Sequence, residues 1–319
     1  MDFEFESMER EQSKLSVAVF GPSGSGKTTA ALKLAKGIQL QLYPDKSLAE
    51  IGLFVDTERR SSTKSVGRSI GGDVLEPMEM YSFEAPFDVV KLAELIQYAV
   101  EKRGKKIIVI DSYTAFWSGS EGILDKVAYW EVEHNASKKL YGAWSEKEII
   151  LKKNLLKGLM TNSNAHIIMC FRAKTEYVVE TNQYGKQQPR AIGLKEDMQQ
   201  DVRYEFDSVL SLDRETHVPE IVKDRIGFVE YRLTAENPNQ PITIEDGKAL
   251  AKLVSEGLSL EEVTKRKYET LVRYVLNEKA HNAARTIAFE KAKDVKLTEE
   301  YLRELDYEKL TQLVKYLKG

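Results

Sequence analysis

Residue types that mark several protein classes are scarce in this chain of 319 residues. A single cysteine, Cys170, excludes a disulfide framework, a cysteine-rich zinc module and iron–sulfur ligation. The four histidines are scattered, with neither an i, i+4 pair nor a His-Glu-x-x-His pattern. A metal ion held mainly by protein side chains is therefore not expected.

Long apolar runs and an excess of one charge are also absent. No stretch approaches the roughly 20 apolar residues of a membrane-spanning helix, and the acidic segment Met1–Glu6 does not resemble a signal peptide. The chain has 47 basic and 50 acidic residues and a net charge of −3, so nucleic-acid binding would require a local basic surface. We expect a soluble, cytoplasmic protein without a membrane partner.

What is present is an alternation of apolar strands and helical segments, which predicts an α/β fold with a mostly parallel central sheet. Predicted strands cover residues 15–20, 51–56, 107–111 and 166–171, and predicted helices cover 27–40, 87–102 and much of 121–160. After residue 203 the rhythm changes. Closely spaced strands at 206–212, 218–222 and 227–234 predict terminal antiparallel hairpins.

The domain organisation follows from the same pass along the chain. The length suits two domains, or one large α/β unit with a small appendage. We predict a polar N-terminal tail over residues 1–14 and a large α/β core over 15–255. The charged segment 259–319 is predicted to be a small domain of three or four helices.

A glycine-rich octapeptide follows the first predicted strand and fits the pattern G-x-x-x-x-G-K-[ST]. Its glycines let backbone N–H groups turn inward as an anion nest, and the following helix adds its positive N-terminal dipole. Lys27 is expected to reach the β- and γ-phosphates of ATP, and the Thr28 hydroxyl to bind Mg²⁺. A glycine-rich turn is the alternative, but the position between strand and helix favours phosphate binding. The predicted nucleotide-binding residues are Gly21, Pro22, Ser23, Gly24, Ser25, Gly26, Lys27, Thr28 and Thr29.

Two carboxylates follow other strands of the predicted sheet, at the same edge. Asp111 ends the apolar strand Ile107–Ile110, where it is placed to hold Mg²⁺ through water; a turn or helix-capping Asp is the alternative. Glu58 lies just past the strand that ends at Asp56. It is a candidate for orienting or deprotonating the attacking water, although a surface position is the commoner fate of any Glu.

Two cations, Lys223 and Arg225, are separated by one residue near the end of a predicted strand. At that spacing both side chains project from one face of a strand. They are candidates for stabilising charge on the γ-phosphate of a neighbouring subunit, which requires a ring or a filament. A solvated basic strand edge is the alternative.

Together these residues resemble the RecA-type core of P-loop ATPases. The resemblance implies that Glu58 is the catalytic glutamate and that Asp111-Ser112 ends the strand on the metal side. The Lys223–Gly227 run is similar to the Lys-x-Arg-x-Gly element of RadA-like recombinases and hexameric replicative helicases, where both cations reach the neighbouring nucleotide. A homo-oligomer with ATP and Mg²⁺ is therefore implied.

Within that family, residues 15–235 look like phage-encoded RecA-like ATPases, some of which act in single-strand annealing recombination. The similarity rests on Arg172–Tyr177 and on the segment from Gly193 to Asp207. A phage protein would act in the host cytoplasm. RecA carries Gln-x-Arg where this chain has Cys170-Phe171-Arg172, so Arg172 becomes the candidate γ-phosphate sensor.

The resemblance places single-stranded DNA on the segments after the fourth and fifth strands. The first, 113–148, is rich in aromatic residues, including Tyr113, Phe116 and Trp117, which at helical spacing equally fit a core. The second, 172–201, interleaves cations with tyrosines, which suits a groove that follows phosphates. Its candidate DNA-binding residues are Arg172, Lys174, Lys186, Arg190 and Lys195.

Three functions remain open. The first is a DNA-stimulated ATPase that acts on single-stranded DNA in recombination, annealing or replication. The second is a helicase-like motor or loader ring that uses the same ATP site. The third is a nucleotide-gated module that recruits a partner such as a single-strand-binding protein.

Overall fold

The computed structural model describes residues 9–134, 142–181, 187–198, 200–235, 238–277 and 283–318. It divides into two compact units, one formed by residues 14–254 and the other by residues 255–319 together with the segment before residue 14. The N-terminal segment belongs to the second unit because Glu11 forms a parallel bridge with Leu258. The Gln12 N–H also donates to the Leu258 carbonyl at 2.8 Å.

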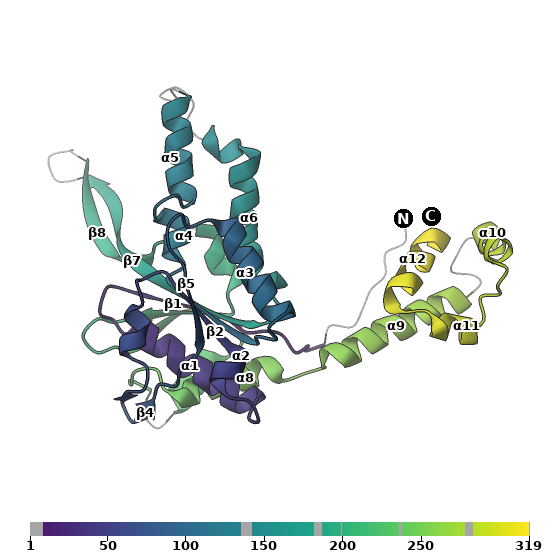
Figure 1. Ribbon diagram of the computed structural model, residues 1–319, viewed down its shortest axis with the longest axis horizontal. Coiled ribbons are helices and arrows are strands. Elements are labelled where there is room, and N and C mark those ends of the chain that lie inside the picture. Colours follow the sequence, from purple (N-terminus) through teal and green to yellow (C-terminus); the bar gives the residue numbers. More distant parts are fainter. Residues whose placement is uncertain are drawn as a thin grey trace. The chain divides into compact units, whose positions relative to one another are not determined.

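The larger unit is built on one central sheet (Figure 1). Neighbouring strands run parallel with two exceptions. At one edge β10 (Pro219–Asp224) runs antiparallel to β9 (Ser208–Leu212), and β8 (Gln187–Glu196) pairs antiparallel with β7 (His166–Thr181). The α/β class and the mostly parallel central sheet are thereby confirmed. In spatial order the strands are β10 (Pro219–Asp224), β9 (Ser208–Leu212), β1 (Ser16–Gly21), β7 (His166–Thr181), β6 (Ile107–Asp111), β2 (Gly52–Asp56) and β5 (Glu79–Ser82), with β8 (Gln187–Glu196) on β7.

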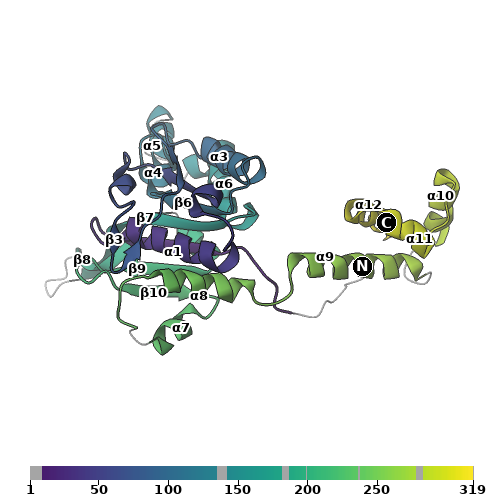
Figure 2. The same cartoon turned by 60° about the horizontal axis from the view of Figure 1, so that its bottom comes forward.

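Helices cover both faces of this sheet, which explains why its inner strands are apolar throughout rather than alternating. On one face, α1 (Lys27–Leu42) and α8 (Ile244–Ser255) share a core that includes Leu34, Ile38 and Leu250. On the other face lie α3 (Val89–Glu101), α4 (Thr114–Ser118), α5 (Ile123–Glu133) and α6 (Lys147–Asn162) (Figure 2). Two core clusters, one on each side of the sheet, fix the strands from which the site is built.

One predicted strand is a helix. Apolar and polar side chains alternate over residues 229–234, but the structure forms α7 (Phe228–Thr234) there. Gly227 adopts the left-handed conformation at φ 89°, and the Asp224 carboxylate accepts the Val229 N–H at 2.8 Å. An acidic cap at the first turn stabilises a helix, so local capping overrides the strand-like alternation.

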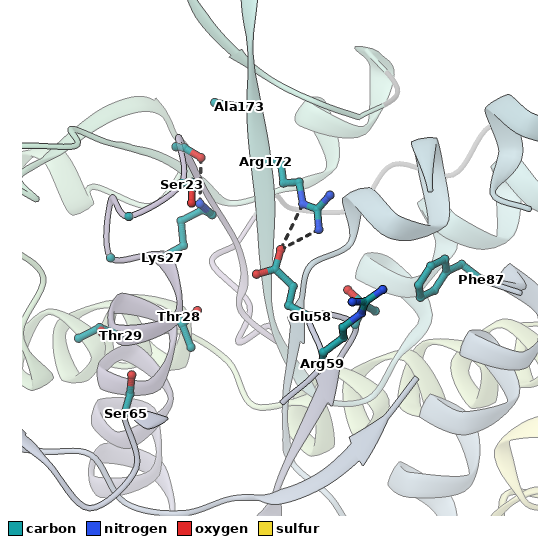
Figure 3. Close-up of a pocket in the computed structure, with 14 residues that line it drawn as sticks. Ser23, Lys27, Thr28, Thr29, Glu58, Arg59, Ser65, Phe87, Arg172 and Ala173 are labelled. Carbon is teal, nitrogen blue, oxygen red and sulfur yellow. Dashed lines mark hydrogen bonds and ion pairs between the residues drawn. The ribbon is translucent and has the colours of Figure 1, made fainter. Parts of the chain in front are cut away.

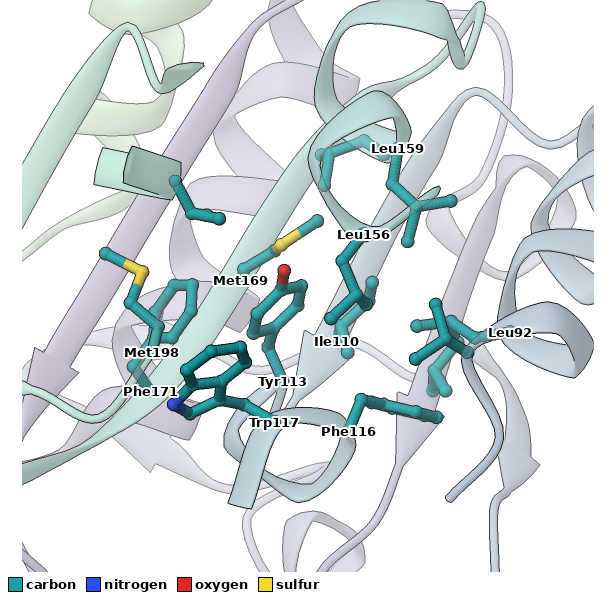
Figure 4. Close-up of a cluster of buried hydrophobic side chains, with 14 of the residues drawn as sticks. Leu92, Ile110, Tyr113, Phe116, Trp117, Leu156, Leu159, Met169, Phe171 and Met198 are labelled. Carbon is teal, nitrogen blue, oxygen red and sulfur yellow. The ribbon is translucent and has the colours of Figure 1, made fainter. Parts of the chain in front are cut away.

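Three aromatic residues of the 113–148 segment favour the core over a DNA surface. Tyr113 and Phe116 are completely buried and Trp117 is 7% exposed (Figure 4). These three side chains belong to the core beneath α3 and α6, so they are not surfaces for DNA. Trp117 also packs against Trp144, with their ring centroids 6.0 Å apart. Tyr141 lies outside the described residues.

The smaller unit is helical, as expected. It contains α9 (Leu260–Leu276), α10 (Ala283–Lys293), α11 (Glu299–Glu304) and α12 (Tyr307–Lys318). Ser259 and Glu262 form a capping box that begins α9, and Val272, Leu302 and Leu310 are among the side chains of a separate apolar core. Within the described ranges of the chain, no helix is long and apolar enough to cross a membrane.

The remaining short elements lie in the connections. They are α2 (Leu48–Ile51), β3 (Ser69–Ile70), β4 (Asp73–Val74) and the 3-10 turns Ser61–Lys64, Ala143–Ser145 and Gln200–Glu205. Strands β3 and β4 form a two-stranded hairpin whose Asp73 pairs with the buried Lys33 of α1 at 3.0 Å.

Candidate nucleotide-binding site

A cleft of about 980 Å³ lies at the carboxyl ends of β1 and β2, beside Arg172 and Ala173 of β7 (Figure 3). This is the edge at which parallel α/β sheets bind ligands. The octapeptide after β1, the residues after β2 and the continuation of β7 all contribute to the cleft. Its lining residues are Gly21, Ser23, Gly24, Gly26, Lys27, Thr28, Thr29, Thr57, Glu58, Arg59, Ser65, Phe87, Arg172 and Ala173.

The glycine-rich loop has the conformation that phosphate binding needs. Gly24 and Gly26 adopt φ angles of 83° and 87°, a region that other residues rarely occupy. A Cβ at Gly21 would lie 2.5 Å from the Ser25 Oγ and 2.8 Å from the Leu212 carbonyl, so the loop also requires glycine where it leaves β1. The buried Ser25 hydroxyl has no hydrogen-bond partner within the described chain. The loop is shaped for an anion, and α1 presents its N-terminus to the same place.

The Lys27 ammonium is bound to its own loop. It donates to the carbonyl oxygens of Gly21 and Pro22, at 2.9 Å each. These neutral acceptors are weaker partners for an ammonium than phosphate oxygens, because charge-assisted hydrogen bonds are roughly twice as strong. A bound triphosphate would therefore compete effectively for Lys27.

Thr28 and Asp111 meet at the floor of the cleft. The Thr28 hydroxyl donates to Asp111 Oδ2 at 2.5 Å, and Asp111 is 2% exposed. Burial, with a smaller contribution from the charge of Glu58, raises the pKa of Asp111 to about 6. A hydroxyl and a carboxylate oxygen at such proximity fit Mg²⁺, which prefers oxygen ligands and would relieve the cost of the buried charge.

No cluster of three or more His, Cys, Asp or Glu that could hold a metal occurs in the described part of the chain. Thr28 and Asp111 would hold Mg²⁺ together with phosphate oxygens and water. When bound, the cation would neutralise charge on the phosphates.

Thr57 fixes the position of Glu58, a contribution that the sequence analysis missed. The Ser112 N–H donates to Thr57 Oγ1 at 2.8 Å, and that hydroxyl donates to the Ser112 carbonyl at 3.1 Å. The Thr57 N–H donates to the Asp111 carbonyl at 2.8 Å. These bonds join the ends of β2 and β6, so Glu58 projects from a rigid base.

Glu58 forms an ion pair with Arg172 across the cleft. Its Oε1 accepts from Arg172 Nε at 3.2 Å and from Nη2 at 3.1 Å. Arg172 is next to Gly21 in the register of β1 and β7, which explains why its side chain reaches the nucleotide cleft. The Arg172 side chain is 60% exposed, and such solvated pairs are weak and readily exchanged.

The other predicted DNA-binding residues lie on or beyond the base of the β7–β8 hairpin. Lys174 pairs with Asp197 at 2.7 Å, and the Ser118 hydroxyl donates to the same carboxylate at 2.7 Å. Lys195 is paired with Lys174 in the β7–β8 register. Lys186 lies outside the described residues. Arg190 is opposite Val178 on β8, and its side chain is outside the described part.

Lys223 and Arg225 occupy different environments. The Lys223 ammonium donates to the carbonyls of Arg203, Tyr204 and Phe206, at 3.1, 2.8 and 2.5 Å. Burial, followed by the nearby charge of Arg225, lowers the pKa of Lys223. Arg225 lies just past β10, is exposed, and has no side-chain partner among the described residues. Lys223 therefore stabilises its own subunit in this structure, whereas Arg225 is available to another molecule.

Two comparisons with known proteins give matches. The structure is similar to that of a KaiC-like protein from the hyperthermophilic archaeon Pyrococcus horikoshii OT3, at 18% identity and a TM-score of 0.34, covering 66% of this chain and 79% of that one. No curated protein matches the chain. A family model described as an AAA domain matches residues 13–243, which is well over half of the sequence. The chain is a nucleotide-binding P-loop ATPase that belongs to this AAA domain family.

Proposed function

We propose that this protein is a RecA-type ATPase that hydrolyses ATP with Mg²⁺ and acts on single-stranded DNA in recombination, annealing or replication. The observation that carries the proposal is the Glu58–Arg172 ion pair at 3.1 Å. It joins the candidate catalytic carboxylate to the first residue that follows the buried part of β7. A ligand on the β7–β8 hairpin therefore has a short physical connection to the hydrolytic site.

The chemistry follows from the arrangement of the cleft. The loop amides and the Lys27 ammonium bind and orient the triphosphate, and the Thr28 and Asp111 oxygens would hold Mg²⁺. Glu58 orients a water molecule and accepts its proton as the water attacks the γ-phosphate. Because the Arg172 guanidinium is paired with Glu58, a γ-phosphate that attracts Arg172 would release the carboxylate for this step.

The base of the hairpin supports the connection to DNA. The Arg172 N–H donates to Thr114 Oγ1 at 2.9 Å, and the Asp197 N–H donates to the Arg172 carbonyl at 2.7 Å. With Lys174 and Ser118 also bonded to Asp197, a displacement of the hairpin would pull on Arg172 and on α4. This is the physical route by which a bound strand would alter the position of Glu58.

Assembly is the remaining part of the proposal. The exposed Arg225 has the chemistry of a residue that stabilises γ-phosphate charge in a neighbouring subunit, and this role needs a homo-oligomer, either a ring or a filament. Lys223 is already bonded to three carbonyl groups of its own subunit. The proposal therefore gives the role between subunits to Arg225.

The test measures ATP hydrolysis with and without a single-stranded oligonucleotide, together with strand annealing and unwinding of a forked duplex. We expect hydrolysis that the oligonucleotide stimulates, with annealing. Glu58→Gln should keep ATP binding and lower turnover by roughly 10²-fold, the scale of general-base catalysis. Glu94→Gln, which neutralises an exposed carboxylate on α3, serves as the matched control and should retain turnover.

Three results would contradict the proposal. Hydrolysis that oligonucleotide does not change, with nucleotide-dependent binding of a single-strand-binding protein, would favour the recruiting module. Unwinding of the fork would favour the helicase-like motor. Loss of ATP binding in Glu58→Gln would count against its role in activating water.

A further inference from the structure

A second hollow, of about 750 Å³, adjoins the nucleotide cleft on the side of β5. The two hollows share Thr57, Arg59 and Phe87 as lining residues. None of the functions assigned above uses the second one. Besides the shared residues it is lined by Asp56, Arg60, Ser82, Phe83, Glu84, Ala85 and Ser120.

Two consecutive arginines in this hollow adopt an unfavourable backbone conformation. Arg59 and Arg60 have φ angles of 54° and 63°, in the left-handed region that residues with a Cβ seldom occupy. The buried Asp56 carboxylate holds this turn, because it accepts the Arg60 N–H at 2.6 Å and the Ser62 hydroxyl at 3.4 Å. Strained turns that a buried group supports in this way are concentrated at functional sites.

The two guanidinium groups have no partner of their own. Within the described ranges, neither Arg59 nor Arg60 has a side-chain hydrogen bond or ion pair, and both are exposed. Glu84 also lines the hollow, is exposed and forms no ion pair in the described structure. Asp56 is occupied by the turn. The lining therefore holds two arginines and two carboxylates, and the two guanidinium groups are exposed beside Glu58 without a partner in the described structure.

Aromatic side chains line the same hollow and continue along β5. The rings of Phe83 and Phe87 are stacked with centroids 6.3 Å apart, and Tyr81 meets Phe83 edge-to-face at 5.8 Å. Tyr81 is 47% exposed. Phe87 and Arg59 both line the nucleotide cleft as well (Figure 3).

We propose that this arginine hollow binds single-stranded nucleic acid, with backbone phosphates on Arg59 and Arg60 and a base stacked on the ring of Phe87. Guanidinium groups bind phosphate oxygens bidentately, and bases stack on aromatic rings regardless of sequence. An acidic protein surface would satisfy the arginines but would make no use of the adjoining aromatic row. The inference rests on the proposed function, and it assigns part of the strand to residues that directly follow Glu58 rather than to the β7–β8 hairpin.

The experiment measures binding of fluorescein-labelled oligothymidylate to the full-length chain by anisotropy over a series of salt concentrations. Arg59→Ala/Arg60→Ala should weaken binding at least tenfold. It should also reduce the slope of log K against log salt by about 1.4, because each lost contact to a single strand contributes about 0.7. Lys91→Ala/Lys102→Ala removes two exposed cations, one in α3 and one at its C-cap, and is the charge-matched control, expected to bind as the parent does.

Stacking is tested with a second variant and a second probe. Phe87→Leu should weaken binding of oligothymidylate about fivefold and leave unchanged the binding of an abasic oligonucleotide of equal charge. The circular dichroism spectrum and the melting temperature show that each variant is folded.

The outcomes separate this inference from the proposed function. If the parent binds oligothymidylate and both the double-alanine variant and its control bind equally well, the arginine hollow is excluded while the proposed function stands. If the parent binds no oligonucleotide, both the inference and the proposed function are wrong. If the double-alanine variant instead lowers the oligomeric state measured by light scattering and keeps its oligonucleotide affinity, the hollow receives an acidic surface of another copy, and the inference is overturned.

Discussion

The nucleotide cleft and the base of the β7–β8 hairpin are built in opposite ways, although they meet at Arg172. The phosphate-binding loop is a continuous octapeptide, and Lys27 bonds to residues five and six positions earlier. The hairpin base joins residues that are far apart in sequence. Arg172 bonds to Glu58 across 114 positions, and Ser118 bonds to Asp197 across 79. Phosphate binding is therefore a local property, whereas its connection to the hairpin is a tertiary one.

The largest effect is expected in the phosphate-binding loop, whose contacts are local in sequence. Lys27→Ala removes the ammonium that would bind the phosphates, and turnover should fall by roughly 10³-fold, the scale of losing a charge-stabilising donor. Nucleotide affinity should fall with it, while melting temperature stays close to that of the parent. Steady-state hydrolysis and nucleotide titration check this, with Lys91→Ala as a control. Near-normal hydrolysis in Lys27→Ala would refute the phosphate assignment.

Arg172→Ala is expected to uncouple hydrolysis from the β7–β8 hairpin without loss of phosphate binding. Arg172→Ala removes the partner of Glu58 and one connection to the hairpin, so oligonucleotide stimulation of hydrolysis should fall about tenfold, the scale of a single charge-assisted contact. Affinity for a fluorescent ATP analogue should change little because the loop and Lys27 are intact. Stimulation that persists in Arg172→Ala would show that the two regions are not coupled through this pair.

Lys223 and Arg225 sharpen the comparison because one is bonded within the subunit and the other is not. Lys223→Met leaves three carbonyl groups with fewer partners and should lower the free energy of unfolding by about 1–2 kcal/mol. Arg225→Ala should leave stability unchanged and lower turnover only in the assembled protein. Urea unfolding and hydrolysis distinguish the two.

Mixing provides the control for Arg225. Subunits with Lys27→Ala and subunits with Arg225→Ala should partly restore hydrolysis when combined, because each supplies what the other lacks. An absence of any restoration would argue that Arg225 does not act on a neighbouring subunit.

The smallest effect is expected at His166, the first residue of β7. Burial and the nearby charge of Lys14 lower the pKa of His166 to about 3, so the folded state keeps this imidazole neutral. Below the ordinary histidine pKa of 6.5 the unfolded chain binds the extra proton, and stability is lost as the pH falls from 6.5 toward 3. At pH 5.5 the loss is about 1.4 kcal/mol. Urea unfolding at pH 7.0 and 5.5 should show a smaller difference for His166→Gln than for the parent; equal differences would contradict the assignment.

Sequence patterns predicted the parallel strands well because strands buried on both faces are uninterrupted apolar runs. The run Ile107–Ile110 is apolar throughout and is completely buried between two layers of helices. The strand predicted over residues 227–234 was wrong for the opposite reason. Its alternation fits a strand, and only the cap that Gly227 and Asp224 provide makes it a helix.

Side-chain pairing was beyond the sequence for a related reason. Arg172 was assigned both to the γ-phosphate and to DNA, and the register of β1 with β7 places it beside Glu58. Thr57 carries no motif, yet its hydroxyl joins the ends of β2 and β6. Lys223 and Arg225 look equivalent at their spacing, and their difference depends on carbonyl groups about twenty residues away.

The order of residues alone determined the phosphate-binding loop, the α/β class and the positions of Asp111 and Glu58 after their strands, because these depend on short-range backbone preferences and on burial. Tertiary structure alone decided which charges meet. Salt bridges and hydrogen bonds require two groups to lie within a few ångströms, and only strand register and packing bring Arg172 to Glu58 and leave Arg59 and Arg60 without a described partner.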